Sequence, residues 1–135
     1  MTDNKARTRG VHHVGLTVPD LGAAREFFAD ALGFEPVGDV PEYPAVFLSD
    51  GSIMITLWQA EDPANAVPFD RRNNIGLHHL ALRVGDASDL QRLSSELGSR
   101  DDLVVEFEPE GLGDTGIQHM MCRVPGNIRL ELIAV

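Results

Sequence analysis

An internal repeat constrains the fold of this chain more than any other feature of its sequence. Residues 10–20 (GVHHVGLTVPD) align with residues 76–86 (GLHHLALRVGD) at a constant offset of 66, and six of the eleven positions are identical. The uncommon His-His pair recurs in register in both copies. A repeat of this kind predicts two copies of one supersecondary unit, because a single unit cannot bury its own hydrophobic face.

Each copy begins with a strand in which apolar and polar residues alternate, expected at residues 11–18 in the first copy and 77–84 in the second. The alternation places the second histidine of each pair, His13 or His79, on the polar face of its strand. The first histidine of each pair, His12 or His78, falls by the same parity on the apolar face. We therefore expect structural roles for His12 and His78, and we consider His13 and His79 candidate site residues.

A helix and three shorter strands complete each copy. Asp20 suits the N-cap of the first helix, either Asp86 or Ser88 suits that of the second, and Gly33 suits the C-terminal end of the first helix. The short strands are expected at residues 35–40, 45–49 and 52–58 in the first copy and at residues 103–108, 117–124 and 128–135 in the second.

The sequence thus predicts one α+β domain over residues 10–135. Its first module covers about residues 10–60, a linker covers about 61–75, and the second module covers about 76–135. We expect the two βαβββ modules to form a curved mixed sheet with the helices on its outer face.

Composition excludes several classes of partner. The 135 residues include 21 acidic and 11 basic ones, for a formal charge of −10. Such a chain repels phosphate backbones and anionic lipid headgroups, so neither nucleic acid nor a membrane is expected as a partner. No apolar run approaches the roughly 20 residues of a membrane span, and no secretory signal is visible, so we expect a cytoplasmic protein. The single cysteine, Cys122, excludes an intrachain disulfide and a cysteine-rich zinc site.

In their order and spacing, these motifs resemble the vicinal oxygen chelate superfamily, which includes glyoxalase I, bleomycin resistance proteins and extradiol dioxygenases. The resemblance is carried by residues 13–21, Phe27-Phe28, Leu32-Gly33-Phe34, residues 79–84 and residues 125–132. The last segment is similar to the turn and strand DPDGxxIEL of the family, from which it departs at Val124, Gly126 and Asn127.

The resemblance implies a divalent metal ion at the floor of a cleft between two modules, with His13, His79 and Glu131 as its ligands. Two imidazoles and one carboxylate leave roughly three positions of an octahedral ion open. The resemblance favours Fe(II) or Mn(II), with Zn, Ni or Co as alternatives, and a small-molecule substrate bound through two neighbouring oxygens. Two-module relatives commonly dimerise, often with each cleft built from two subunits, so we expect a homodimer.

Several relatives have a further Glu or Gln ligand on the last strand of the first module. Residues 52–58 contain no carboxylate, and we expect Met54 at this position, with Thr56 and Trp58 on the same face. The missing carboxylate argues against a glyoxalase-type reaction, in which one carboxylate moves a substrate proton, and favours dioxygenase-like chemistry. The alternatives are a glyoxalase-like lyase or isomerase, a thiol transferase, and a non-catalytic protein that binds a drug-like molecule.

Three further residues are candidates for the substrate pocket. By parity, Arg83 lies on the face of His79 and Arg129 on the face of Glu131, where either guanidinium would pair with a substrate anion or with carboxylates at the rim. His119 is a candidate acid or base beside the metal. Its strand is apolar on both faces, so the orientation of His119 stays open.

Overall fold

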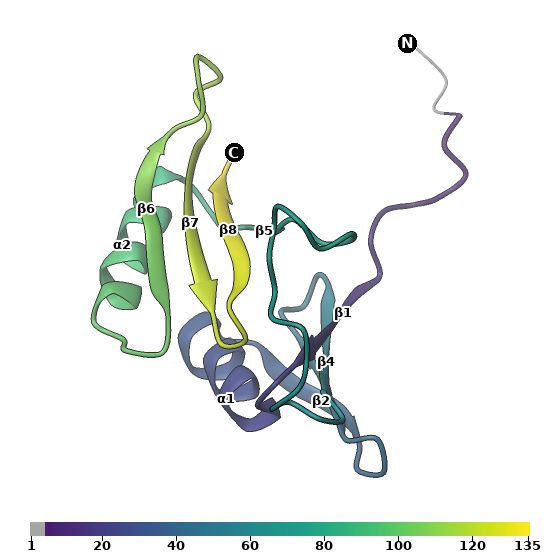
Figure 1. The fold of residues 1–135 in the computed structure, drawn as a ribbon. Helices are drawn as coiled ribbons and strands as arrows, with labels where there is room; N and C mark the ends of the chain where they lie inside the picture. Colours follow the sequence, from purple (N-terminus) through teal and green to yellow (C-terminus); the bar gives the residue numbers. More distant parts are fainter. Residues whose placement is uncertain (1–4) are drawn as a thin grey trace.

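The computed structural model describes residues 5–135 and contains two modules of the expected βαβββ type (Figure 1). The first module consists of β1 (His13–Val18), α1 (Leu21–Glu26), the π-helical turn η1 (Phe27–Ala31), β2 (Glu35–Val40), β3 (Ala45–Ser49) and β4 (Met54–Gln59). The second consists of β5 (Leu80–Arg83), α2 (Ala87–Gly98), β6 (Val104–Gly111), β7 (Gln118–Val124) and β8 (Ile128–Ala134). The α+β prediction is confirmed.

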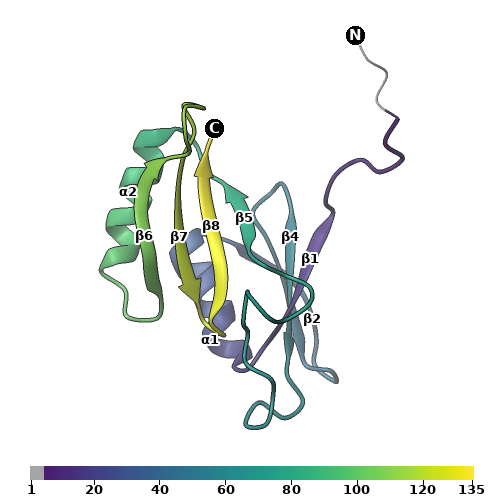
Figure 2. The same ribbon diagram turned by 45° about the horizontal axis from the view of Figure 1, so that its top comes forward.

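The strands of each module form one four-stranded mixed sheet (Figure 2). The strand order is β1-β4-β3-β2 in the first sheet and β5-β8-β7-β6 in the second. In each sheet the first strand of the module runs parallel to the last, while the other pairs are antiparallel. Among the described residues, β1 and β5 each have a strand neighbour on one side only, so both are edge strands.

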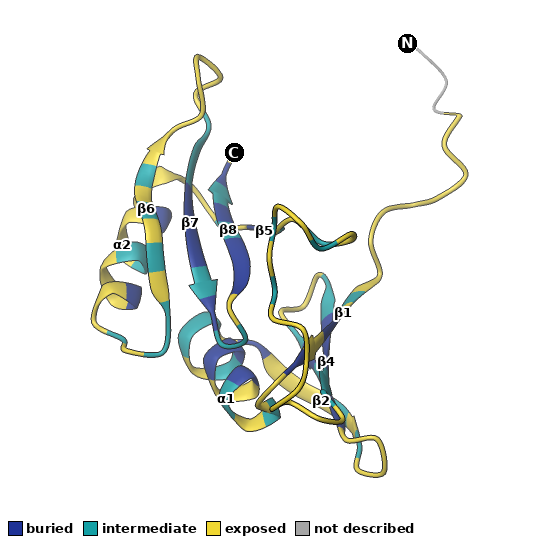
Figure 3. Cartoon of the chain, viewed as in Figure 1, coloured by how far each residue is buried: buried dark blue, intermediate teal, exposed yellow. Residues whose placement is uncertain are grey.

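The apolar sides of both modules share one hydrophobic core. Helix α1 packs on β3 and β4, and α2 packs on β6, β7 and β8. Fully buried side chains from both modules belong to one cluster, among them Phe27, Phe28, Leu57, Leu90 and Leu132. Buried residues concentrate on the central strands and on the inner sides of the helices, whereas the connecting segments are largely exposed (Figure 3). Burial of this shared core fixes the two modules against each other.

Local signals set the ends of the helices. The Asp20 carboxylate accepts a hydrogen bond from the backbone N–H of Ala23, which confirms the expected N-cap of α1. Asp86 forms a reciprocal capping box with Asp89, so Asp86 rather than Ser88 is the N-cap of α2. Gly33 has a φ of +75°, as expected at the end of the first helix. No helix in residues 5–135 is long and apolar enough to cross a membrane.

The turn between β7 and β8 depends on two residues with positive φ. Gly126 has a φ of +91° and Asn127 a φ of +61°. A Cβ atom on Gly126 would lie 3.1 Å from Cδ of Pro19, so glycine also permits this turn to approach the first module closely. Asparagine tolerates this backbone region better than most residues, so Asn127 can stand where the family motif DPDGxxIEL has glycine.

The expectation that His12 and His78 lie on the buried face is wrong. Strand β1 begins at His13 and β5 only at Leu80, so the strand alternation does not extend to His12 or His78. Both residues are exposed. Each places its Nδ1 atom close to Nδ1 of the histidine that follows it, at 2.9 Å in the first copy and 2.8 Å in the second.

Candidate metal centre

Two of the three predicted ligands lie side by side on the polar face of the second sheet. Glu131 is in the middle of β8, opposite Ala81 of β5. Its Oε1 atom lies 3.4 Å from Nε2 of His79, which directly precedes β5. Both side chains retain access to solvent, so an imidazole nitrogen and a carboxylate oxygen face the same accessible region.

His119 joins this pair from the neighbouring strand β7. Its Nδ1 atom lies 2.6 Å from Oε2 of Glu131, and its ring packs against Phe107 with the ring centroids 4.9 Å apart. The hairpin turn pairs Val124 with Ile128, and this register places His119 opposite Ile133, on the face of Glu131. Counting back from the turn would therefore have oriented His119 from the sequence.

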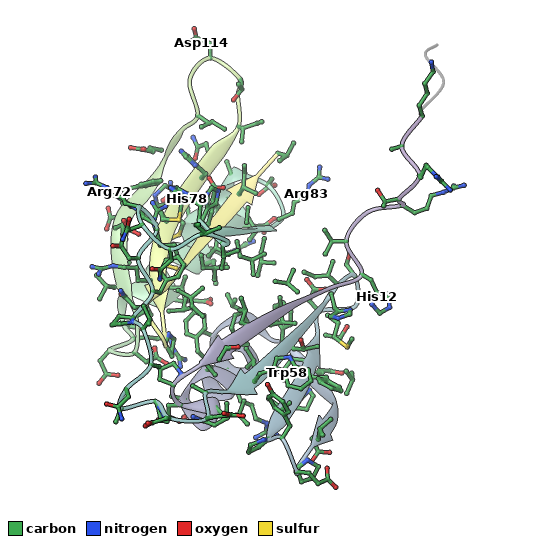
Figure 4. All side chains as sticks on the ribbon, turned by 45° about the vertical axis from the view of Figure 1, so that its right-hand side comes forward. His12, Trp58, Arg72, His78, Arg83 and Asp114 are labelled. Atoms are coloured by element: carbon green, nitrogen blue, oxygen red, sulfur yellow. The ribbon has the colours of Figure 1, made fainter. Side chains whose placement is uncertain are left out.

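His13 lies in the other sheet, at the start of β1. Figure 4 shows the neighbouring residues His12 and His78 on well-separated parts of the molecule, at the starts of the two modules. Within residues 5–135, no group of three or more His, Cys, Asp or Glu side chains is arranged to hold a metal ion. A single chain therefore brings together His79 and Glu131 but not His13, and the ligand roles of all three stay predictions.

The position in the first module that corresponds to Glu131 is occupied by Thr56. Gly15 pairs with Thr56 just as Ala81 pairs with Glu131, and Gly15 and Ala81 are equivalent in the repeat. The expectation of Met54 at this position is wrong, because Met54 pairs with His13, two residues earlier on the strand.

The Thr56 side chain is buried and already engaged. It is only 3% exposed, and its hydroxyl oxygen accepts a hydrogen bond of 2.9 Å from the indole N–H of Trp58. Trp58 in turn packs edge-on against Tyr43 and is tilted against Phe47. Thr56 and Trp58 thus form a small aromatic-covered cluster on the first sheet.

The two candidate arginines differ in their environment. Arg83 is exposed, and Figure 4 shows it projecting outward from the end of β5. Arg129 is only 9% exposed; its Nε donates to Glu106 at 2.8 Å, and one Nη atom lies 3.4 Å from Nδ1 of His78. Partial desolvation, followed by the Arg129 charge, lowers the pKa of His78.

A cavity of about 580 Å³ lies elsewhere, between β1, the linker and the turn between β7 and β8. Its lining is largely apolar and includes Val14, Phe69 and Leu77. The volume suits a small ligand. None of the three predicted ligands lines this cavity, so it is separate from the candidate metal centre.

The chain belongs to the Glyoxalase/Bleomycin resistance protein/Dioxygenase superfamily, whose family model matches residues 10–132. It is 27% identical over 145 residues to 2-epi-5-epi-valiolone epimerase of an Actinomyces species, a match that covers 91% of this chain and 78% of that protein. It is also 27% identical over 133 residues to the uncharacterized protein YqjT of Bacillus subtilis (strain 168), covering 92% and 98% of the two chains.

Solved structures show the same fold. A glyoxylase/bleomycin resistance protein/dioxygenase domain from a Frankia species superposes with a TM-score of 0.79 at 25% identity, over 94% of this chain and 92% of that one. Lactoylglutathione lyase from Agrobacterium tumefaciens superposes with a TM-score of 0.72 at 21% identity, over 96% of both chains. The predicted superfamily is therefore confirmed.

Proposed function

We propose that this protein is a divalent-metal-dependent enzyme that binds a small substrate through two neighbouring oxygens. The supporting observation is the 3.4 Å approach of His79 Nε2 to Glu131 Oε1 on an accessible sheet face. An imidazole and a carboxylate suit Fe(II) or Mn(II), and also Zn, Ni or Co. When bound, such an ion acts as a Lewis acid that stabilises negative charge on substrate oxygens. His119 holds the second oxygen of the Glu131 carboxylate and so orients the first toward His79.

His13 completes this ligand set from a second copy of the chain. His13 is the first residue of edge strand β1, and His79 directly precedes edge strand β5; each strand has an unpaired edge among the described residues. Exposed apolar residues precede both edges, Val11 before β1 and Ile75 before β5. Association of β1 with β5 of a second copy would cover these edges and apolar side chains. The proposed assembly is a homodimer with two metal sites.

For the reaction, the dioxygenase-like class is the first candidate. An isomerase of the glyoxalase type would need a base at the position of the first module that corresponds to Glu131. Thr56 stands there, and its hydroxyl is not a base near neutral pH and already accepts a hydrogen bond from Trp58. Two imidazoles and one carboxylate would leave coordination positions of a bound ion open, which would suit a substrate with two neighbouring oxygens and O₂, as in ring cleavage of a catechol.

The second candidate is an epimerase or a related lyase or isomerase, which the similarity to 2-epi-5-epi-valiolone epimerase supports. Such a reaction would move a proton at a carbon beside a substrate oxygen, and the proton would pass through a group other than Thr56. The formal charge of −10 argues against a nucleic acid or an anionic membrane as partner.

One experiment separates these candidates. Protein purified without oxygen is loaded with Fe(II) or Mn(II), and oxygen uptake is measured with catechols. In parallel, hydrogen–deuterium exchange into α-hydroxyketones is followed by NMR in D₂O. Oxygen uptake that disappears in Glu131→Gln, but not in the control Glu96→Gln at an exposed position of α2, supports the first candidate. Exchange with the same dependence supports the second. Tight binding of ligands without metal binding or turnover would contradict both.

A further inference from the structure

A second, polar cavity of about 260 Å³ lies on the same face of the second sheet as Glu131. Three of the ten arginines of the chain line it, Arg71 from the linker, Arg123 from β7 and Arg129 from β8. This concentration of guanidinium groups is unusual in a chain whose formal charge is −10. We call this cavity the arginine pocket.

Two of the three guanidinium groups are paired by a single carboxylate. Glu106 accepts a hydrogen bond of 2.8 Å from Nε of Arg129 and one of 2.9 Å from an Nη atom of Arg71. Burial, the largest single influence, raises the pKa of Glu106, but the hydrogen bond from Arg129 and the charges of Arg129, Arg71 and Arg123 together hold that pKa below its ordinary value. Glu106 is therefore ionised near neutral pH and neutralises one of the positive charges.

Arg123 is the guanidinium that protein groups satisfy least. One of its Nη atoms contacts the Asn127 side chain at 3.3 Å. Its Nε atom is buried and has no hydrogen-bond partner within residues 5–135. A buried donor without a partner is rare in native proteins, and a charged one is the least tolerated. Asp70 also lines the pocket, so three cations face two carboxylates, and the pocket carries a net positive charge.

The register places this positive charge beside the candidate metal centre. Arg123 pairs with Arg129, and the next residues on the same face, Met121 and Glu131, pair with each other. Two residues along a strand correspond to roughly 7 Å. A small molecule bound near Glu131 therefore reaches the arginine pocket with a second functional group.

We propose that the arginine pocket binds an oxyanion group, a carboxylate or a phosphate, of the substrate. This inference rests on the proposed function, because it takes the substrate oxygens to lie at Glu131 and His79. It narrows the substrate class to small molecules that carry two neighbouring oxygens and, roughly 7 Å away, an anionic group. The two Nη atoms of the Arg123 guanidinium would donate two parallel hydrogen bonds to that anion.

The test uses metal-free full-length protein, so its outcome does not depend on catalysis. Inorganic phosphate and acetate are titrated separately at constant ionic strength, and the arginine Nε–H resonances are followed by NMR. We expect saturable binding of at least one anion with a shift of the Arg123 Nε–H signal. Saturation by phosphate alone indicates a phosphate group in the substrate, and saturation by acetate alone indicates a carboxylate. No saturation by either anion would overturn the proposal.

Matched variants separate a built pocket from general charge attraction. Arg123→Gln should weaken binding at least about tenfold, because a charge-assisted pair of hydrogen bonds is lost. Arg25→Gln removes one positive charge from an exposed position on α1 and should bind the anion with wild-type affinity. Equal weakening in both variants would overturn the proposal. Arg123→Lys keeps the charge without the planar donor pair and should bind with intermediate affinity; it replaces Arg123→Gln if that variant does not fold.

The same samples distinguish failure of this inference from failure of the proposed function. Protein that binds the anion but no divalent metal keeps the arginine pocket and contradicts the metal-dependent function. Protein that binds metal but neither anion keeps the function and contradicts the pocket.

Discussion

His119 Nδ1 lies 2.6 Å from Glu131 Oε2, while the other oxygen of the same carboxylate faces His79. His119 thus acts as a positioning residue for a proposed metal ligand. Loss of such an outer partner typically lowers metal affinity by about 10–100-fold. We expect this loss for His119→Ala, measured by calorimetric titration with Mn(II) or Zn(II).

His119→Asn provides the control, because its amide nitrogen can occupy the position of Nδ1. It should recover part of the lost affinity, which a purely structural defect would not allow. Thermal unfolding of both variants checks their folding. Unchanged metal affinity in His119→Ala would contradict the positioning role.

Arg100 and Asp102 predict how stability changes in acid. Two nitrogen atoms of Arg100 donate to the two Asp102 oxygens at 3.0 and 2.8 Å, and the Arg100 guanidinium also lies 5.8 Å from the ring centre of Phe27 in the other module. The hydrogen bond from Arg100 is the main cause that holds the pKa of Asp102 below its ordinary 3.8. Asp102→Asn should lower the free energy of unfolding by about 1 kcal/mol near neutral pH, since the pair is partly exposed.

Because the folded-state pKa of Asp102 is depressed, this contribution is fully present above pH 3.8 and is lost as pH falls through the lower folded-state value. Urea unfolding of the wild type and of Asp102→Asn, measured from pH 7 to pH 3, should therefore give a difference in the free energy of unfolding that is constant well above pH 3.8 and shrinks below it. A difference that stays constant over this range would contradict the assignment.

Cys122 is predicted to be chemically inert in the native state. Its side chain is completely buried, and burial raises the pKa of its thiol to about 12. The thiolate, which is the reactive form, is therefore scarce near neutral pH. A disulfide reagent such as DTNB should leave the folded protein unmodified and react with one thiol per chain in denaturant. Rapid reaction under native conditions would show that β7 opens or is packed differently.

Gly126→Ala should destabilise the fold through both the backbone and the contact with Pro19. The φ of +91° disfavours any side chain, and the added Cβ would lie 3.1 Å from Pro19 Cδ. We expect a loss of about 1–2 kcal/mol in the free energy of unfolding. Gly98→Ala is the matched control, because the space around Gly98 is open and its φ is not positive. Equal effects of the two substitutions would contradict the role of the turn.

Local signals predicted much of the fold from sequence. The residue ranges of β2 and β3 and the N-cap of each helix agree with the structure, because hairpin turns and caps act between residues close in the chain. The repeat indicated the two modules. The first strands begin at His13 and Leu80, later than the alternation predicts, because alternation alone does not show where pairing starts. For the same reason the alternation assigns His12 and His78 to the wrong environment.

The site was predicted less completely, because its arrangement depends on long-range pairing. The parallel pairing of β1 with β4 puts Thr56, rather than Met54, at the position equivalent to Glu131. No turn joins these two strands directly, so no local signal fixes their register. The ion pairs of Glu106 with Arg71 and Arg129 join the linker to two strands and likewise leave no trace in the local sequence.

The central claim is that His13 of one copy and His79 with Glu131 of another hold one metal ion. Mixing the variants His13→Ala and His79→Ala tests it directly, with bound metal per chain measured after unfolding, refolding together and removal of free metal. Each variant alone should bind none.

In a mixed dimer, one site receives both substitutions and the other keeps all three ligands. Random pairing should therefore restore about a quarter of the wild-type metal content. A mixture that binds no more metal than the separate variants, while the wild type binds one ion per chain, would contradict the shared site.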